Sequence, residues 1–277
     1  MKCATSTLHD QLAAHRSFYM STPKEPNFFS NDEVYAKGIR WYQSLFADAK
    51  DDQILGESST HYTMLPTYPG TIDRLKAFCP DLKCVYIMRH PVERLVSHYI
   101  HEWTQGVISC DIDRAIEQFP ELFEYSRYSM QIMPYLQTYG PASVLPMFAE
   151  RFRHNPQQEL ETIFKFLDVK EIPCWRNDIR SNVSAQRLRT CGWRDALVQN
   201  PILSIVRRTL VPKNVRRWIR SLWTMKERPV PSPSSLKKIT QLFDEDLKIL
   251  GDMLGLELSC QTFSQTVIVP NQIRWKM

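Results

Sequence analysis

Hydrophobic residues follow two patterns along the chain, short apolar runs and longer stretches with helical spacing. The short runs predict strands at 17–20, 53–57, 83–88 and, weakened by its proline, 143–148. Helical spacing predicts helices at 4–15, from Asn31 or Asp32 to about Phe46, and at 68–78, 91–103, 111–118, 121–138, 157–167 and 234–254. Strands that alternate with helices indicate an α/β fold whose parallel sheet is covered on both faces.

Composition adds little to this picture until charge is considered. The 277 residues are 43% hydrophobic and 23% charged, which is typical of a globular protein, and we expect one domain over residues 1–277. The net charge of +5 suits anionic ligands without identifying one. Residues 175–232 are rich in arginine and proline and show little periodicity before 212.

The compartment is expected to be the cytoplasm. Seven cysteines form no CxxC pair, and their scattered spacing favours reduced thiols over a disulfide framework. No signal peptide is recognised, and no run approaches the roughly 18 apolar residues of a membrane span.

The first stretch with chemical content is Lys2-Cys3-Ala4-Thr5-Ser6-Thr7, which leads directly into a helix. Small residues allow backbone amides to surround a tetrahedral anion, and the helix N-terminus adds unpaired donors. The lysine supplies a charge and the three hydroxyls supply donors. A plain helix start with Thr or Ser as N-cap is the alternative, and this stretch alone leaves both interpretations open. It is not a Walker A loop, because the lysine comes first and no glycine is present.

A second candidate follows the predicted strand 83–88. Arg89 stands at the carboxyl end of that strand, and Ser97 lies eight residues further on in the next helix. Ligands of open α/β sheets collect at the carboxyl ends of strands, where an arginine and a serine can converge on one phosphate. The alternative is a helix cap with ordinary surface charges.

Together these stretches resemble the sulfotransferase family. Lys2 to Ser6 is similar to the family's 5′-phosphosulfate loop, Lys-x-Gly-Thr-Thr/Ser, with Ala4 where glycine is usual. Arg89-His90-Pro91 to Tyr99 is similar to its 3′-phosphate motif, Arg-x-Pro-x-x-Arg-x-x-Ser-x-Tyr. The resemblance implies a P-loop-like three-layer fold with a central parallel sheet. It also implies a donor, 3′-phosphoadenosine 5′-phosphosulfate, held by Lys2, Cys3, Ala4, Thr5, Ser6, Thr7, Arg89 and Ser97. Lys2 would also act in catalysis, on the departing phosphate.

The acceptor side is suggested by Lys24-Glu25-Pro26-Asn27-Phe28-Phe29, which resembles the heparan-type branch of the family and its bacterial relatives. There the glutamate is the general base, so the resemblance implies that Glu25 takes the proton from an acceptor hydroxyl or amine, and we expect the acceptor to be a carbohydrate. A solvated Lys-Glu pair beside two core phenylalanines is the alternative. Residues 56–62 correspond to a family segment in which Ser58 replaces a common lysine and Thr60 a common proline; His61 is an alternative base.

Two further features accompany the resemblance. Asn182-Val183-Ser184 with Arg187 and Arg189 is similar to the family's basic loop and implies contacts to the nucleotide. Family members carry an apolar strand just before the phosphate loop, whereas only Met1 precedes Lys2 here. We therefore expect a sheet that lacks its central member and a weakly anchored cofactor loop.

Three other functions compete with sulfuryl transfer. A nucleotide kinase would need a Walker A loop and a magnesium-binding aspartate. A binder of acidic polymers would need only positive charge, which the arginines of 205–228 could provide. An inactive sulfotransferase relative is the third alternative, because Ala4 and the absent strand depart from the family pattern. We expect no metal and no nucleic-acid partner.

Overall fold

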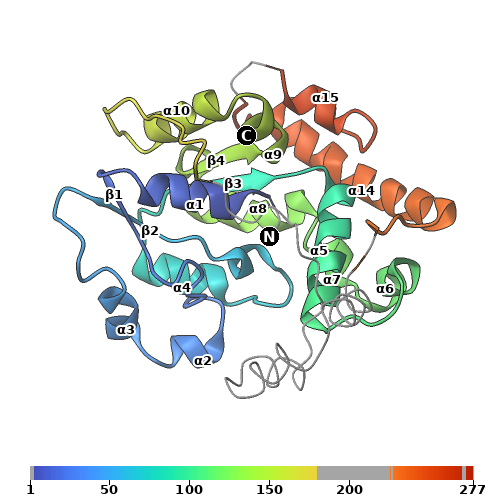
Figure 1. The fold of residues 1–277 in the computed structure, drawn as a ribbon, viewed down its shortest axis with the longest axis horizontal. Coiled ribbons are helices and arrows are strands. Elements are labelled where there is room, and N and C mark those ends of the chain that lie inside the picture. Colours follow the sequence, from blue (N-terminus) through green and yellow to red (C-terminus); the bar gives the residue numbers. More distant parts are fainter. Residues whose placement is uncertain (1–2, 180–224, 226, 270–272, 277) are drawn as a thin grey trace, which may run out of the picture.

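The computed structural model describes residues 3–179, 225, 227–269 and 273–276 (Figure 1). Its strands are β1 (Phe18–Met20), β2 (Ile54–Gly56), β3 (Cys84–Met88) and β4 (Val144–Phe148). β1 pairs with β2 and β3 pairs with β4, both in parallel. All four predicted strands are present and parallel, so the α/β class is confirmed.

Helices connect and cover these strands. They are α1 (Thr5–Ala13), α2 (Asp32–Tyr35), α3 (Ile39–Ser44), α4 (Thr71–Phe78), α5 (Pro91–Gln105), α6 (Ile112–Gln118), α7 (Glu121–Glu124), α8 (Tyr128–Tyr139), α9 (Ala149–His154), α10 (Pro156–Phe166), α14 (Pro233–Leu254) and α15 (Phe263–Val267). Short 3-10 turns occupy Thr60–Thr63 and Pro141–Ser143. Most predicted helices agree with these bounds to within a few residues.

Alternate residues of β3 and β4 enter different parts of the core. Tyr86, Met88 and Phe148 join the cluster that includes residues of α5, α8 and α14. Ile87 and Met147 join the second cluster, which holds residues of α1 and α10. Because side chains of a strand alternate between the faces of a sheet, this division shows helices packed on both faces. Figure 1 shows the same layering, with β3 and β4 between α10 and α8.

Two predicted long helices are each divided in the structure. The helix predicted to Phe46 is split into α2 and α3, because Gly38 has φ of 81°, which no helix continues. The helix predicted over 121–138 is split into α7 and α8. Its break is held by Gln131, whose side-chain amide donates to the carbonyls of Glu124 and Leu65.

The predicted weakness of 143–148 is wrong, since β4 is buried along its whole length. Pro146 lies opposite Tyr86 in the register of the pair. Among the described strands β4 pairs only with β3, and a proline is tolerated where its missing donor faces an unpaired edge.

A cavity of about 1010 Å³ separates the two parallel pairs. Residues of β1, β2 and β3 line it, and Thr5 and Leu8 of α1 reach it as well. The cavity therefore runs up to the first turn of α1, where the anion loop is predicted. The expected single domain without its first strand stays a prediction.

Candidate functional site

The anion loop enters α1 through a strained backbone. Ala4 is the N-cap of α1, with φ of 65° and ψ of 13°, and no side chain caps the helix. The predicted alternative of a Thr or Ser N-cap is therefore wrong for this helix. Thr5, Ser6 and Thr7 form the first turn and are half-buried, and no side chain caps the amides of this turn. Lys2 lies outside the described residues.

Cys3, near the start of the chain, and Tyr128, which bonds Arg89, are both buried close to β3. Cys3 is 2% exposed and belongs to the cluster that contains Ile87. Burial raises the pKa of Tyr128 well above its usual value, and the neighbouring Cys3 thiol adds to this effect. The Tyr128 hydroxyl accepts a 3.1 Å hydrogen bond from the Arg89 amide and donates one of 2.5 Å to the Arg89 carbonyl. The Tyr128 hydroxyl thus holds the Arg89 backbone at the end of β3, and Cys3 of the other predicted anion-binding stretch lies nearby in the core.

The Arg89 side chain is largely enclosed, with 12% of its surface exposed. Its guanidinium forms an ion pair of 3.0 Å with Glu93, in the first turn of α5, and Arg228 reaches the same carboxylate. Ser97 lies on α5 one further turn along and is half-buried. Arg89 thus stands at the carboxyl end of β3 and Ser97 in the helix that follows it, as predicted. Arg187 and Arg189 lie outside the described residues.

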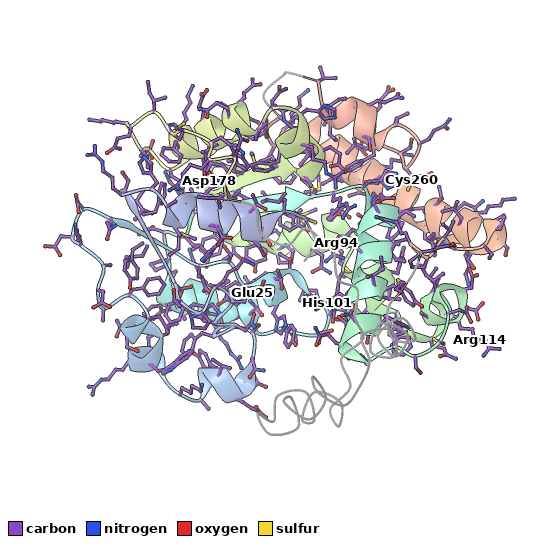
Figure 2. All side chains as sticks on the ribbon, in the orientation of Figure 1. Glu25, Arg94, His101, Arg114, Asp178 and Cys260 are labelled. Atoms are coloured by element: carbon purple, nitrogen blue, oxygen red, sulfur yellow. The ribbon has the colours of Figure 1, made fainter. Side chains whose placement is uncertain are left out.

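Glu25 lies in the segment after β1, below α1 in the view of Figure 2. Lys24 donates to Glu25 Oε1 at 2.7 Å, and the Thr60 hydroxyl donates to Oε2 at 2.9 Å. Burial acts to raise the pKa of this carboxyl, but the hydrogen bond and charge of Lys24, with the bond from Thr60, hold it below its usual value. The side chain keeps 34% of its surface exposed, so an ionised carboxylate remains accessible.

Glu57 fixes the segment that carries Thr60. Its carboxylate accepts hydrogen bonds from Tyr42, Tyr62 and Ser59 at 2.7–2.9 Å. The Ser59 hydroxyl also accepts the Asn27 amide at 3.0 Å, which ties this segment to the one that carries Glu25. Burial raises the pKa of Glu57 despite the three donors. This carboxylate is fully occupied by the fold and serves to position its neighbours.

The alternative base His61 is stacked on Tyr68, with ring centroids 4.7 Å apart. Burial lowers its pKa, while the charge of nearby Glu25 acts in the opposite direction. Its Nδ1 atom is buried and has no hydrogen-bond partner among the described residues. His61 therefore stays a candidate, but no bond orients it as Thr60 and Lys24 orient Glu25.

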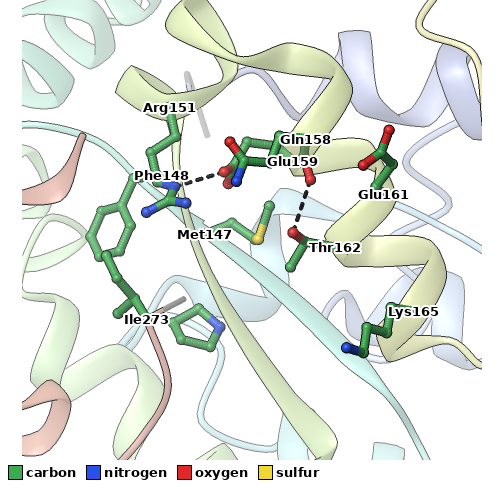
Figure 3. Close-up of a pocket in the computed structure, with 10 residues that line it drawn as sticks. Met147, Phe148, Arg151, Gln158, Glu159, Glu161, Thr162, Lys165 and Ile273 are labelled. Carbon is green, nitrogen blue, oxygen red and sulfur yellow. Dashed lines mark hydrogen bonds and ion pairs between the residues drawn. The ribbon is translucent and has the colours of Figure 1, made fainter. Parts of the chain in front are cut away.

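Figure 3 shows a second hollow, of about 290 Å³, between β4, α10 and Ile273. Arg151 and Glu159 form a 2.7 Å ion pair there, with 11% and 2% of their side chains exposed. Arg151 also donates to the carbonyls of Val267 and Val269 at 3.4 and 2.9 Å. The pair joins α9 to α10 and the segment around α15, so we assign it a structural role.

No cluster of three or more His, Cys, Asp or Glu side chains arranged to hold a metal ion is found among the described residues. None of the described helices combines the length and the apolar character needed to cross a membrane.

Comparison with known proteins gives the family. The profile of the sulfotransferase domain matches residues 1–191, more than half of the chain. The chain belongs to the sulfotransferase domain family.

Curated relatives include two mouse enzymes. Heparan sulfate glucosamine 3-O-sulfotransferase 3A1 is 26% identical over 157 residues, which cover 53% of this chain and 39% of the relative. Bifunctional heparan sulfate N-deacetylase/N-sulfotransferase 2 is 26% identical over 191 residues, covering 61% and 21%. The chain therefore spans only about two fifths and one fifth of these relatives. A sulfotransferase from Alicyclobacillus acidocaldarius shares the fold, with a TM-score of 0.64, 21% identity and 93% coverage of each chain.

Sequence patterns do not indicate the contacts that three residues of this sulfotransferase domain make in the structure. Thr60 appears in the sequence only as a replacement for a common proline, and nothing there shows that it reaches Glu25. Tyr128 lies 39 positions from Arg89, and no motif links them. His9 bonds Ser58 across 49 positions, and only its place one turn after Thr5 could have drawn attention to it.

Proposed function

We propose that this chain transfers a sulfuryl group from 3′-phosphoadenosine 5′-phosphosulfate to a hydroxyl or amine of an acceptor, and that the acceptor is a carbohydrate. Its membership of the sulfotransferase domain family supports sulfuryl transfer. The observation that carries the choice of donor is that Tyr128 bonds Arg89 at the end of β3, while the buried Cys3 packs in the same core cluster as Ile87 of β3. This arrangement supports the proposal that both predicted anion-binding stretches lie at one edge of the sheet, as a nucleotide with phosphates at both ends requires.

The residues fit such a donor at both ends. Arg89 and Ser97 are suited to the 3′-phosphate, since an enclosed guanidinium and a hydroxyl make charge-assisted hydrogen bonds. The uncapped first turn of α1, with Thr5 to Thr7, is suited to the 5′ end. Once bound, the nucleotide would supply the activated sulfuryl group. The amides and hydroxyls of the first turn, with Lys2, would stabilise the charge that grows on the departing phosphate.

Glu25 is the proposed general base. Lys24 and Thr60 orient its two oxygens and keep the carboxylate ionised, and its exposed face is open to an acceptor. A positioned base of this kind contributes about 10²–10⁴ to the rate. Because sulfuryl transfer resembles phosphoryl transfer, the remaining acceleration is assigned to positioning and charge stabilisation.

The carbohydrate acceptor rests on the relatives. Their names specify heparan sulfate as the material that they modify, and one name specifies glucosamine 3-O-sulfation. At 26% identity we extend only the acceptor class to this chain. We also propose a reducing compartment such as the cytoplasm, which the six free thiols among the described cysteines support.

An inactive relative that binds nucleotide or acidic polymers is the second candidate. The large cavity between the two strand pairs and the strained Ala4 favour it, because both weaken the support of the anion loop. Calorimetry tests the donor assignment, and the transfer assay separates an active enzyme from an inactive nucleotide binder. The proposed enzyme should bind adenosine 3′,5′-bisphosphate and not ATP, whereas binding of neither favours a polymer binder or a dead enzyme.

Transfer itself is tested with labelled donor and a fractionated extract, followed by identification of the labelled product. Glu25→Gln should abolish most transfer and leave nucleotide binding intact, and Lys2→Ala should also abolish most transfer. Equal turnover by Glu25→Gln and the unmodified protein would remove Glu25 from its proposed role. His61→Gln is the matched test of the alternative base.

A further inference from the structure

A buried histidine lies between the predicted donor loop and the predicted base. His9 follows Thr5 by four residues in α1 and is 5% exposed. Residues four apart share one face of a helix, so His9 lies on the same face of α1 as Thr5, one turn further along the helix. Its Nδ1 atom is 3.1 Å from the hydroxyl of Ser58, in the segment after β2.

The contacts of Ser58 continue to the base. The Ser58 amide donates a 3.3 Å hydrogen bond to the carbonyl of Lys24, and Lys24 holds the carboxylate of Glu25. A continuous series of contacts therefore runs from the donor helix through His9, Ser58 and Lys24 to Glu25. Among the titratable residues of this series, His9 is the nearest in sequence to the donor loop.

The surroundings of His9 disfavour the charged form of its imidazole in the unliganded protein. Burial lowers the pKa of His9, and the positive charge of Lys24 acts in the same direction. The carboxylates of Asp10 on α1 and Glu25 beyond Lys24 act in the opposite direction. An anion placed at the first turn would shift this balance towards the imidazolium, because a nearby opposite charge favours the charged form.

We propose that His9 takes up a proton when the sulfuryl donor binds, and that it is a positioning residue which supplies a titratable positive charge between the donor and Glu25. The inference rests on the proposed function. The proton comes from solvent, stays on the imidazole while the anionic nucleotide is bound, and returns to solvent when the product nucleotide leaves. In the charged form both ring nitrogens donate, so Nδ1 donates to the Ser58 hydroxyl.

This assignment explains a departure from the family pattern in this sequence. Ser58 stands where the resembling segment commonly has lysine, so a permanent positive charge is missing there. His9 lies beside the Ser58 hydroxyl and, once it is protonated on donor binding, supplies a positive charge there. A purely structural histidine would make the same hydrogen bond without any change in its protonation.

Isothermal titration of adenosine 3′,5′-bisphosphate at pH 7.5, in buffers of different ionisation enthalpy, measures proton uptake on binding. Phosphate groups titrate near pH 6, so the quantity compared is the difference between variants. We expect His9→Gln, which keeps a polar side chain without a charge, to take up fewer protons than the unmodified protein. His154→Gln, on an exposed part of α9, is the matched control and should behave as the unmodified protein does.

The outcomes separate this inference from the proposed function. No binding of the bisphosphate by the unmodified protein contradicts the donor assignment itself. Binding with equal proton uptake in His9→Gln and the unmodified protein overturns only the role of His9. Should His9→Gln fail to fold, histidine NMR on the unmodified protein decides the question. Addition of bisphosphate must raise the titration midpoint of the His9 ring by about one pH unit or more. An unchanged midpoint refutes the proposal.

Discussion

The hydroxyl of Thr60 donates a 2.9 Å hydrogen bond to the carboxylate of Glu25, 35 positions away in the sequence. The bond joins the segment after β1 to the 3-10 turn after β2, and it fixes one carboxylate oxygen while Lys24 fixes the other. The orientation of the proposed base therefore depends on a residue outside its own segment.

Thr60→Val removes this hydroxyl and keeps the shape of the side chain. A hydrogen bond to a charged group contributes roughly 1.5–3 kcal/mol, so we expect kcat to fall by about 10-fold or more while nucleotide affinity is retained. Steady-state kinetics with a saturating donor measures the effect. Thr162→Val is the matched control, because its hydroxyl bonds only a helix carbonyl on the exposed side of α10. Equal kcat values for the two variants would contradict the positioning role of Thr60.

The protonation of Glu25 depends on Lys24. Burial acts to raise the carboxyl pKa, and the bond and charge of Lys24 oppose it. In Lys24→Met burial dominates, so the acid limb of the pH–rate profile should move upward. In the unmodified protein the limb due to Glu25 should lie below the usual glutamate value of about 4.3. Rates measured from pH 3 to 8 test this, and identical profiles for both proteins would refute it.

The lowered pKa of Glu25 also determines how this residue contributes to the free energy of unfolding as the pH changes. Because the pKa of Glu25 is lower in the folded chain than in the unfolded chain, the ionised carboxylate stabilises the fold above its unfolded pKa. This contribution is lost as the pH falls through the folded value. Urea unfolding of the unmodified protein and Glu25→Gln between pH 3 and 7 should therefore show a difference in free energy that shrinks towards acid pH.

Periodicity predicted the strands and most helices because burial on one face leaves a visible repeat. Residues 83–88 form an apolar run between polar residues, and they are found as β3 with alternate side chains in two clusters. The breaks within predicted helices were missed since they depend on single backbone angles and distant side chains. Gly38 adopts a positive φ, and Gln131 supplies bonds to Glu124 and Leu65.

The candidate site was predicted by its motifs and not by its contacts. The sequence pointed to Arg89 and Glu25, since each stands in a recognisable pattern. It could not show that Tyr128 bonds both backbone groups of Arg89, or that His9 bonds Ser58. These pairs are brought together only by the packing of separate elements, and a single sequence carries no record of that packing.

Ala4 provides a test of backbone strain in the anion loop. Its φ of 65° lies in the left-handed region, which disfavours residues other than glycine by about 1–2 kcal/mol. Glycine also loses more conformational entropy on folding, which offsets about 0.5–1 kcal/mol of the relieved strain. Ala4→Gly should therefore stabilise the protein by up to about 1 kcal/mol. Ala14→Gly, at the other end of α1 with φ of −79°, should destabilise it instead. Denaturant unfolding measures both, and a less stable Ala4→Gly protein would contradict the strain.

The Tyr128 hydroxyl is the most direct test of the nucleotide site, since it is 1% exposed and bonds both the amide and the carbonyl of Arg89. Tyr128→Phe leaves these backbone groups without that partner, at a cost of about 1–3 kcal/mol, and releases Arg89 from its position. We expect affinity for adenosine 3′,5′-bisphosphate to fall by about 5- to 100-fold, while affinity for adenosine 5′-monophosphate, which lacks the 3′-phosphate, stays within about twofold.

Calorimetry with the two nucleotides measures this selectivity. Tyr135→Phe serves as the control for the loss of a buried hydroxyl, because Tyr135 donates to the Tyr62 carbonyl and makes no described bond to Arg89. It should lower stability without changing the ratio of the two affinities. An equal loss of both affinities in Tyr128→Phe would show that Tyr128 supports the fold as a whole. Arg89 would then have no assigned part in recognising the 3′-phosphate.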